Sequence, residues 1–325
     1  MKKVIAIVIL CGCALVFGYS VEAHESGQYH FTGTLNGKYP IFMTLALNDL
    51  NVDGYYYYYS IGTLIDLEGT FMNDGSFVIN EFVDGECTGT FKGTFFNGYT
   101  TASGSWTDAP GKKNLPFSLE LVAGEVVFES HRYEVTAYAP QFTGDAHGMQ
   151  ELITDTILAL FESFIEDYRL DMEDEPEWGW EFVCDYTIEF YSEYFISILL
   201  EVYEHTGGAH GNAYYVCLNH LEEKGSAEFL DLEDFFLGNT DYGAILSEIL
   251  IHELKEQDAA WILDGSIQNI EPDLLVFNVT PKGLLCTFAP YAVGPYAEGP
   301  HQVTIPFKKL RSIIDTRGPL GTFIK

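Results

Sequence analysis

Turn signals divide residues 24–123 into short apolar runs, and no helical pattern occurs among them. The signals recur about every eight to twelve residues, which is typical of antiparallel β-structure. They pair Asn or Asp with Gly, residue types that tolerate the positive φ angles of hairpin turns. The predicted turns are Asn36-Gly37, Asp53-Gly54, Asn73-Asp74-Gly75, Asp84-Gly85 and Asn97-Gly98. The predicted strands are Gln28–Leu35, Tyr39–Leu47, Gly54–Ser60, Thr63–Phe71, Ser76–Phe82, Cys87–Phe95, Tyr99–Trp106 and Asn114–Leu121.

A weak internal repeat supports a single meander of these strands. Gly is followed by Thr or Ser and then by a large apolar residue at Gly33-Thr34-Leu35, Gly69-Thr70-Phe71, Gly89-Thr90-Phe91, Gly93-Thr94-Phe95 and Gly104-Ser105-Trp106. Strands of this number are enough to close a small barrel or to form a strongly curled sheet. We therefore expect an all-β meander or small barrel-like domain over residues 24–123.

From Val126 onward the pattern indicates mixed helices and strands. A strand over Val126–Tyr138 leads into a helix over about residues 146–168, where apolar residues recur at helical spacing. A second helix spans about Asp241–Gln257, with Thr240 as its predicted N-cap. The other predicted elements are the strands Trp178–Phe190, Tyr194–Glu204, Ala213–His220, Leu274–Val279, Gly283–Phe288 and Gln302–Pro306, and a short helix Lys308–Ile314. This order favours an α+β domain over residues 126–325, with an antiparallel sheet packed with two main helices.

Residues 1–23 have the organisation of a secretory signal peptide. Lys2 and Lys3 precede an apolar run over Val4–Phe17, and Val21-Glu22-Ala23 resembles a cleavage site. The run is shorter than the roughly 20 residues that a membrane span needs. Leu10-Cys11-Gly12-Cys13 resembles a lipobox, but the apolar run continues past Cys13. We expect cleavage after Ala23 and a periplasmic or secreted protein, with a lipoprotein anchored at Cys13 as the alternative.

Cleavage leaves four widely spaced cysteines without a CxxC zinc or thioredoxin-like pattern: Cys87, Cys184, Cys217 and Cys286. An exported chain permits disulfides without requiring them. In the predicted meander, Cys184 and Cys217 both fall opposite about Leu200, on strands roughly 9.5 Å apart. A disulfide needs Cα atoms within about 7 Å. This pairing is therefore disfavoured, and the others stay open beside free thiols.

The chain is strongly acidic, with 48 Asp and Glu against 16 Lys and Arg in 325 residues and a formal charge of −32. Nucleic-acid binders place Lys and Arg on phosphates, so DNA and RNA are excluded as partners. Anionic membrane surfaces repel such a chain too, which leaves cationic proteins as the natural macromolecular partners. The apolar content of 47% still provides for a folded core.

Three segments resemble an exported bacterial domain family that includes the extracellular region of the RsiV anti-sigma factor and the N-terminal module of the peptidoglycan deacetylase PdaC. They are the Tyr203–Asn212 turn with its Thr-Gly-Gly-Ala-His core, the Leu230–Phe236 entry to a helix, and the Phe288–Pro300 loop followed by Val303–Pro306. The resemblance covers about residues 126–325. It implies an exported module that meets peptidoglycan-related partners, lysozyme among them. It does not imply an activity of its own.

Departures from the family pattern narrow this expectation. Ala292 stands where relatives often carry Glu. Only Met1-Lys2-Lys3 precedes the apolar run, so a sigma-binding segment and sigma-factor control are not supported. The chain ends at Lys325, which leaves no room for a catalytic deacetylase domain with its metal-binding motifs.

Candidate binding residues lie in two loops: Thr206, Gly207, Gly208, His210, Asn212, Pro290, Tyr291, Pro295 and Tyr296. His210 is either a base or ligand on a constrained loop, or one of the residues that shape a turn for which Gly207, Gly208 and Gly211 supply unusual φ values. The Pro290–Pro300 loop is either a rigid recognition loop or a buried connection.

Other chemistry-bearing patterns are weaker. Position 256 is Glu where a zincin beginning at His252-Glu253 needs His, so a zinc protease is rejected. The acidic residues of 166–177 are interpreted as a solvated face, because Pro176 stands where a calcium loop needs Gly. Tyr55–Tyr59 place aromatics on both faces of one strand, for core packing or for sugar stacking.

We expect an exported, non-enzymatic binding protein without a metal or cofactor, which recognises a cationic wall-acting protein such as lysozyme. A small-ligand or glycan carrier built on the β domain and a wall-directed hydrolase that uses His210 are the alternatives. The oligomeric state is not determined by the sequence.

Overall fold

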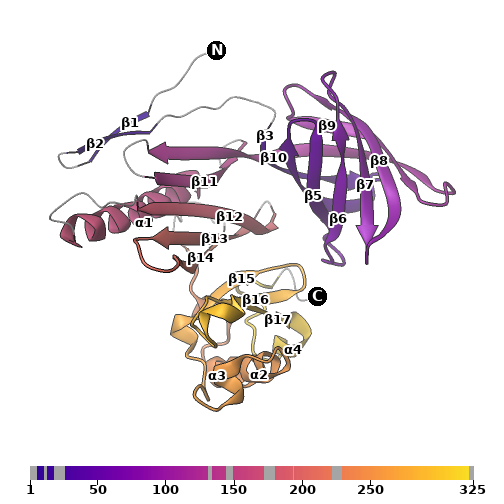
Figure 1. Cartoon of the computed structure of the whole chain (residues 1–325). Helices are drawn as coiled ribbons and strands as arrows, with labels where there is room; N and C mark the ends of the chain where they lie inside the picture. The colour runs from indigo at the N-terminus through magenta and orange to yellow at the C-terminus, as the bar shows by residue number, and fades with distance from the viewer. Residues whose placement is uncertain are drawn as a thin grey trace. The chain divides into compact units, whose positions relative to one another are not determined.

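The computed structural model describes residues 6–10, 13–17, 26–130, 134–143, 149–171, 180–192, 194–221 and 229–321 (Figure 1). The chain divides into two compact units, Met1–Val127 with Ala139–Ala146, and Phe128–Tyr138 with His147–Lys325. Near the N-terminus, β1 (Ala6–Leu10) and β2 (Cys13–Phe17) pair in antiparallel fashion. Signal-peptide cleavage and acylation at Cys13 stay predictions.

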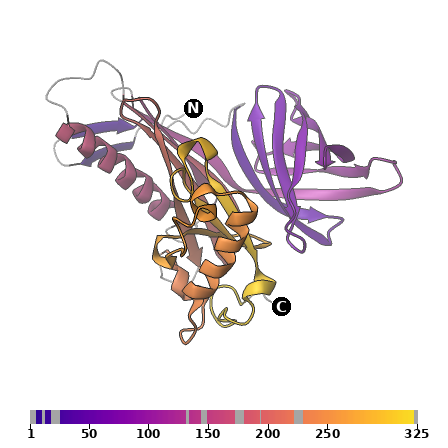
Figure 2. The ribbon, with the colours of Figure 1, turned by 60° about the horizontal axis from the view of Figure 1, so that its bottom comes forward.

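Antiparallel strands form a closed barrel in the first unit (Figures 1 and 2). Each strand pairs with the next one along the chain, and the last also pairs with the first, which closes the meander. The predicted meander is thereby confirmed in its barrel form. The strands are β3 (Ser26–Leu35), β4 (Tyr39–Asn48), β5 (Asn51–Tyr58), β6 (Ile65–Phe71), β7 (Ser76–Val83), β8 (Glu86–Phe96), β9 (Thr101–Asp108) and β10 (Asn114–Ser130).

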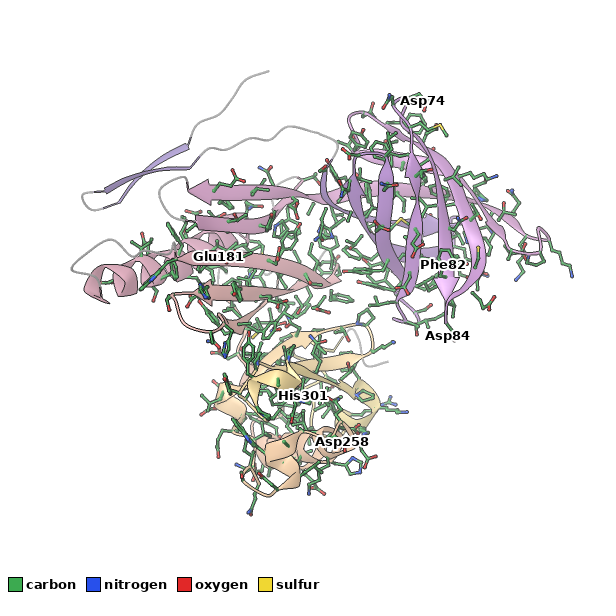
Figure 3. The ribbon with its side chains drawn as sticks, viewed as in Figure 1. Asp74, Phe82, Asp84, Glu181, Asp258 and His301 are labelled. Carbon is green, nitrogen blue, oxygen red and sulfur yellow. The ribbon has the colours of Figure 1, made fainter. Side chains whose placement is uncertain are left out.

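Most predicted hairpin turns lie where the sequence placed them. Asn36, Asp84 and Asn97 have φ values of 56°, 52° and 54°, and each is followed by a Gly with positive φ. Asp74 caps another turn by accepting hydrogen bonds from Ser76, and Asp74 and Asp84 lie at opposite ends of the barrel (Figure 3).

The predicted turn at Asp53-Gly54 is wrong, because both residues lie inside β5. The chain turns instead at Asp49, whose φ is 54°. Gly54 is needed for close approach between strands: a Cβ there would lie 2.0 Å from the carbonyl oxygen of Thr44.

The repeated glycines explain how so small a barrel closes. A Cβ on Gly33 would lie 2.1 Å from the carbonyl oxygen of Ser118, and one on Gly104 would lie 2.1 Å from that of Lys92. Real Cβ contacts are never this short, so the neighbouring strands approach closely because these positions lack a side chain. Glycine within a strand permits such sharp bending.

The barrel interior is filled by side chains, including Phe31, Phe77, Phe91 and Phe117 in one apolar cluster. One carboxylate, that of Glu81, lies among them and is only 4% exposed. It accepts hydrogen bonds from the Tyr56 hydroxyl, from Thr88 Oγ1 at 2.8 Å and from Trp106 Nε1 at 3.0 Å. These donors replace the water that burial removes.

The tyrosine run Tyr55–Tyr59 alternates as predicted. Tyr56 points into the barrel cluster, whereas the ring of Tyr57 stacks on Phe42 at 5.5 Å. Both tyrosines are 1% exposed, so core packing accounts for both faces.

The second unit contains two sheets and four helices among its described residues (Figures 1 and 2). The first sheet has the order β14-β13-β12-β11, and the second has the order β15-β16-β17. The strands are β11 (Glu134–Phe142), β12 (Glu181–Tyr191), β13 (Phe195–His205), β14 (Asn212–Leu221), β15 (Val276–Val279), β16 (Gly283–Phe288) and β17 (His301–Pro306). The helices are α1 (Met149–Asp171), α2 (Tyr242–Glu256), α3 (Ala260–Leu263) and α4 (Phe307–Leu310), with short 3-10 turns η1 (Leu232–Phe235), η2 (Pro272–Leu274) and η3 (Tyr296–Glu298).

The expectation of an antiparallel sheet is wrong for one pair of strands. β11 pairs with β12 in parallel fashion, and α1 makes the connection between them. Parallel neighbours need such a crossover, because a tight turn reverses the chain. α1 packs on this sheet through Phe161 and Phe164, whose rings lie 6.0 and 5.4 Å from that of Phe182.

A buried polar network joins the two sheets on the side opposite α1. Ser197 Oγ donates to Asn219 Oδ1 at 2.7 Å and accepts from Asn278 Nδ2 at 2.9 Å and from the backbone N–H of Val279 at 3.0 Å. Asn219 also donates to the carbonyl of Phe277 at 2.9 Å. We call this set the Ser197 network. It fixes the position of β15 against β13 and β14, because a shift would leave buried polar atoms unpaired.

The predicted N-cap of α2 is displaced by one residue. Asp241 accepts from the N–H of Ala244 at 3.1 Å, while the hydroxyl of Thr240 donates to the carbonyl of Leu237 at 2.6 Å. A carboxylate is a strong cap, since it also interacts favourably with the helix dipole. In the part of the chain that the structure describes, no helix combines the length and the apolar character that a membrane span requires.

The cysteines Cys87, Cys184, Cys217 and Cys286 are free thiols. Cys184 lies opposite Val202 and Cys217 opposite Leu199, on the two strands that flank β13. The disulfide between Cys184 and Cys217, which the sequence disfavoured, is therefore absent.

Replacing the buried barrel carboxylate tests its role. Glu81→Gln leaves a single acceptor oxygen for three donors, and we expect a loss of about 2 kcal/mol or more in barrel stability. Amide hydrogen exchange of β7 and β8 in the full chain measures it. Glu86→Gln, at an exposed position on β8, is the matched control. Equal protection in both variants would contradict the assigned role.

Glu189 gives the second unit a pH-dependent stability. It is the extra residue at a bulge of β12, and burial raises its pKa to about 7. The folded state therefore holds the proton more tightly than the unfolded chain. The contribution of Glu189 to the stability of the folded state is therefore complete below about pH 4.5, and it is lost as the pH rises through about 7. At about 1.4 kcal/mol per pKa unit, the effect is at most about 3 kcal/mol.

Glu189→Gln should therefore raise the melting temperature at about pH 8 and flatten its decline above about pH 5. Thermal denaturation across this range measures both effects. Glu248→Gln, at an exposed site on α2, should leave the pH profile unchanged. If the melting temperature of Glu189→Gln depends on pH in the same way as that of the wild type, protonation of Glu189 does not affect the stability of the fold.

Candidate recognition surface

The β13–β14 connection is a tight turn shaped by glycines. Gly207 and Gly208 have φ values of 102° and 94°, as the sequence predicted. Gly211 differs: its φ is not left-handed, and it is required for space, since a Cβ there would lie 2.4 Å from the Tyr203 ring. The ring of Tyr203 thus packs directly on the backbone at the end of the turn.

His210 projects from this turn and is exposed. Its Nδ1 lies 2.8 Å from the carbonyl oxygen of Gly211, so Nδ1 carries a proton that it donates there. Its ring stacks on Tyr296, with centroids 3.9 Å apart and planes inclined by 15°. Tyr291 completes the group, 6.4 Å from His210 and 5.5 Å from Tyr296. We call His210, Tyr291 and Tyr296 the aromatic trio.

The Pro290–Pro300 loop presents the two tyrosines. Tyr291 has a φ of 69° and is 49% exposed. A positive φ is strained for a bulky residue and persists only where the surroundings enforce it. Val293 provides an anchor, because its side chain is buried and its carbonyl accepts from the N–H of Trp261 at 3.1 Å. The loop is thus exposed at Tyr291 and buried at Val293.

The structure brings together the two loops that the sequence singled out, through His210, Tyr291 and Tyr296. Pro295 sits at the start of η3, directly before Tyr296. Thr206 and Asn212 are exposed, and Asn212 lies opposite Glu204 at the start of β14. Sequence reasoning did not assign roles to Tyr203 or Val293, although both fall inside the quoted motifs. The φ role that it gave to Gly211 is wrong, because this residue is needed for space beside Tyr203.

The arrangement supports binding better than bond-making chemistry. Exposed rings on rigid loops offer contact area at a low entropic cost. Within the described ranges, no three His, Cys, Asp or Glu side chains gather as a metal site. His252 faces Glu253 at 3.9 Å, and Glu253 in turn pairs with Lys309 at 2.8 Å. The predicted acidic face lies largely outside the described residues, as 172–179 do.

Two segments of the chain match protein families. Residues 126–213 match the family described as deacetylase PdaC, and residues 233–308 match a family described as a protein of unknown function, DUF3298. The chain is 28% identical to the peptidoglycan-N-acetylmuramic acid deacetylase PdaC of Bacillus subtilis over an aligned segment of 139 residues. This segment covers 41% of this chain. The match spans only 29% of that enzyme. Part of this chain is therefore similar to a PdaC-related module.

Two solved structures are also similar. A DUF3298 family member from Bacteroides fragilis has 17% identity and a TM-score of 0.44, covering 59% of this chain and 88% of its own. A DUF3298 family protein from Pseudomonas aeruginosa has 19% identity and a TM-score of 0.40, covering 59% and 92%. The His210 turn belongs to the PdaC-matched segment and the tyrosine loop to the DUF3298-matched segment, so the aromatic trio joins the two.

The contact between Tyr203 and Gly211 is open to a direct test. Gly211→Ala should displace the Tyr203 ring and destabilise the second unit by about 1–3 kcal/mol. Tyr203→Leu combined with Gly211→Ala should restore part of this loss, because the smaller side chain makes room. Thermal denaturation compares them with Gly238→Ala, where a Cβ meets nothing within 4 Å. Equal effects at Gly211 and Gly238 would rule out the proposed packing.

Proposed function

We propose that this chain is an exported, non-enzymatic binding protein of the bacterial envelope, which recognises a cationic wall-acting protein such as lysozyme. The observation that carries the proposal is the stack of His210 on Tyr296, which joins two loops into one exposed aromatic surface. The resemblance of the Tyr203–Asn212 and Phe288–Pro300 motifs to the extracellular region of the RsiV anti-sigma factor supports the same reading.

Charge supports the choice of partner. With a formal charge of −32, the chain attracts basic proteins over long range. This attraction speeds association and fades with salt, whereas buried aromatic contacts persist. Aromatic side chains also contribute a large share of binding energy at interfaces. We therefore expect charge to govern the encounter and the aromatic trio to govern the lifetime of the complex.

A wall-directed hydrolase that uses His210 is the alternative that the relation to PdaC favours. A catalytic base needs a nucleophile or an orienting partner within hydrogen-bond reach. In the described part of the chain, the contacts of His210 are the Gly211 carbonyl and the two tyrosine rings. This environment fits a contact residue better than a base. The packed barrel interior likewise offers less support for a small-ligand carrier.

Calorimetry with a hen-type lysozyme tests the proposal on the mature chain, residues 24–325. Binding should survive physiological salt with a Kd below about 100 µM. Tyr291→Ala and Tyr296→Ala should each weaken it by about tenfold or more, because each removes a ring from the interface. Tyr194→Ala is the control, since this tyrosine is 66% exposed on the connection at the other end of β13.

Binding that disappears at physiological salt would leave charge alone as its cause. Binding that falls equally in the Tyr194→Ala control would refute recognition by the trio. Turnover of wall fragments by the wild type, abolished by His210→Ala in a folded chain, would establish the hydrolase instead.

A further inference from the structure

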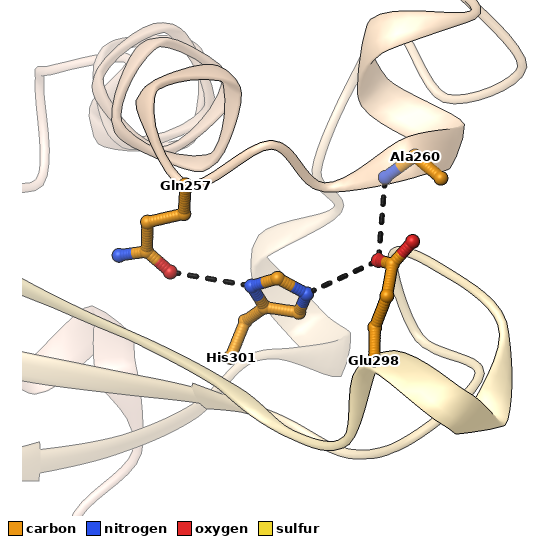
Figure 4. Close-up of polar contacts among 4 residues, drawn as sticks. All are labelled: Gln257, Ala260, Glu298 and His301. Carbon is orange, nitrogen blue, oxygen red and sulfur yellow. Dashed lines mark hydrogen bonds and ion pairs between the residues drawn. The ribbon is translucent and has the colours of Figure 1, made fainter.

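The tyrosine loop is also held by a set of polar contacts around His301 (Figure 4). His301 begins β17, directly after the loop, and its side chain is 11% exposed. Its Nδ1 lies 3.3 Å from Gln257 Oε1, at the end of α2. Its Nε2 lies 3.4 Å from Glu298 Oε2, in η3. Both ring nitrogens thus face oxygen atoms.

The orientation of the Gln257 amide is fixed by its other end. Gln257 Nε2 donates to the carbonyl oxygen of Gln302 at 2.9 Å, so Oε1 is the atom that faces His301. An oxygen acceptor there requires a proton on Nδ1 of His301. In a neutral ring, the lone pair of Nε2 would then face the Glu298 carboxylate. Only the doubly protonated imidazole donates to both partners.

Glu298 links this histidine to the loop itself. Its Oε2 also accepts from the N–H of Ala260 at 3.3 Å. The carboxylate folds back over Gly294, where a Cβ would lie 2.0 Å from Oε2. Glu298 belongs to the same 3-10 turn as Tyr296. The contacts of this carboxylate therefore tie the turn that presents the stacked ring to Ala260 and His301.

The surroundings of His301 hold one charged group within ion-pair distance, among the residues described: Glu298. Gln257 is neutral, as is Phe288, which is paired with His301 on β16. Protonation of His301 thus has a single carboxylate as its electrostatic partner, and that carboxylate lies in the tyrosine loop.

We infer that His301 is a positioning residue, which in its protonated form bridges Gln257 and Glu298 and so holds Tyr296 in register to stack on His210. The inference deepens the proposed function and rests on it for the link to partner binding. The tether is complete while both ring nitrogens carry a proton, and it weakens when Nε2 loses its proton. A partner should therefore meet a better-ordered loop while His301 is doubly protonated.

Amide hydrogen exchange of the mature chain, without any partner, tests the tether. The amides of Glu298 and Gly299 report on η3, since they donate to the carbonyls of Pro295 and Tyr296 at 3.0 Å each. In the wild type, their protection, corrected for intrinsic rates, should fall about threefold or more between about pH 5.5 and 7.5. His301→Leu should lower it by a similar factor at about pH 5.5.

His301→Gln provides the matched variant, because a neutral amide still donates to Glu298 and does not titrate. Its protection should be independent of pH. The amide of Leu285 on β16 is the internal control and should not change. Protection in the wild type that does not depend on pH, or unchanged protection in His301→Leu, would overturn the inference. Failure of the wild type to bind lysozyme while η3 behaves as described would overturn only the proposed partner.

Discussion

The second unit depends on one buried hydroxyl, that of Ser197, which acts as a donor to Asn219 and as an acceptor for Asn278 and Val279. Ser197, Asn219 and Asn278 are each 1% exposed or less, so water does not replace a lost partner. Unlike apolar contacts, which tolerate sliding, these directional hydrogen bonds form in only one register of the two sheets. It therefore determines where the DUF3298-matched strands dock on the PdaC-matched sheet, and with them where the tyrosine loop meets the His210 turn.

Each loop is then held in place by contacts within its own neighbourhood. Tyr203 packs on Gly211 beneath the turn, and the buried Val293 ties the tyrosine loop to Trp261. Exposed rings on such loops lose little entropy on binding, which lets a small surface contribute substantial affinity. Close packing against glycine also shapes the barrel of the first unit. There, glycines lack a side chain at positions where neighbouring strands approach closely.

Features encoded by neighbouring residues could be predicted from the sequence, and features that depend on distant contacts could not. The hairpin turns at Asn36, Asp84 and Asn97 follow from local φ preferences. The same signal failed at Asp53-Gly54, because Gly54 serves an approach to a neighbouring strand rather than a turn. The parallel pairing of β11 with β12 was missed, since a helix between two strands does not reveal their direction. Both candidate loops were identified by their motifs, but the stack of His210 on Tyr296 depends on the Ser197 network, which leaves no signal of its own in the sequence.

The central claim is that two separate loops form one recognition surface. Nuclear Overhauser effects between the ring protons of His210 and Tyr296, recorded on the mature chain before and after a basic lysozyme is added, test it most directly. The account predicts cross-peaks between the two rings in the free chain, and shifts of both rings together on addition of the partner. Absence of the cross-peaks, or shifts confined to one loop or to the barrel, would contradict it.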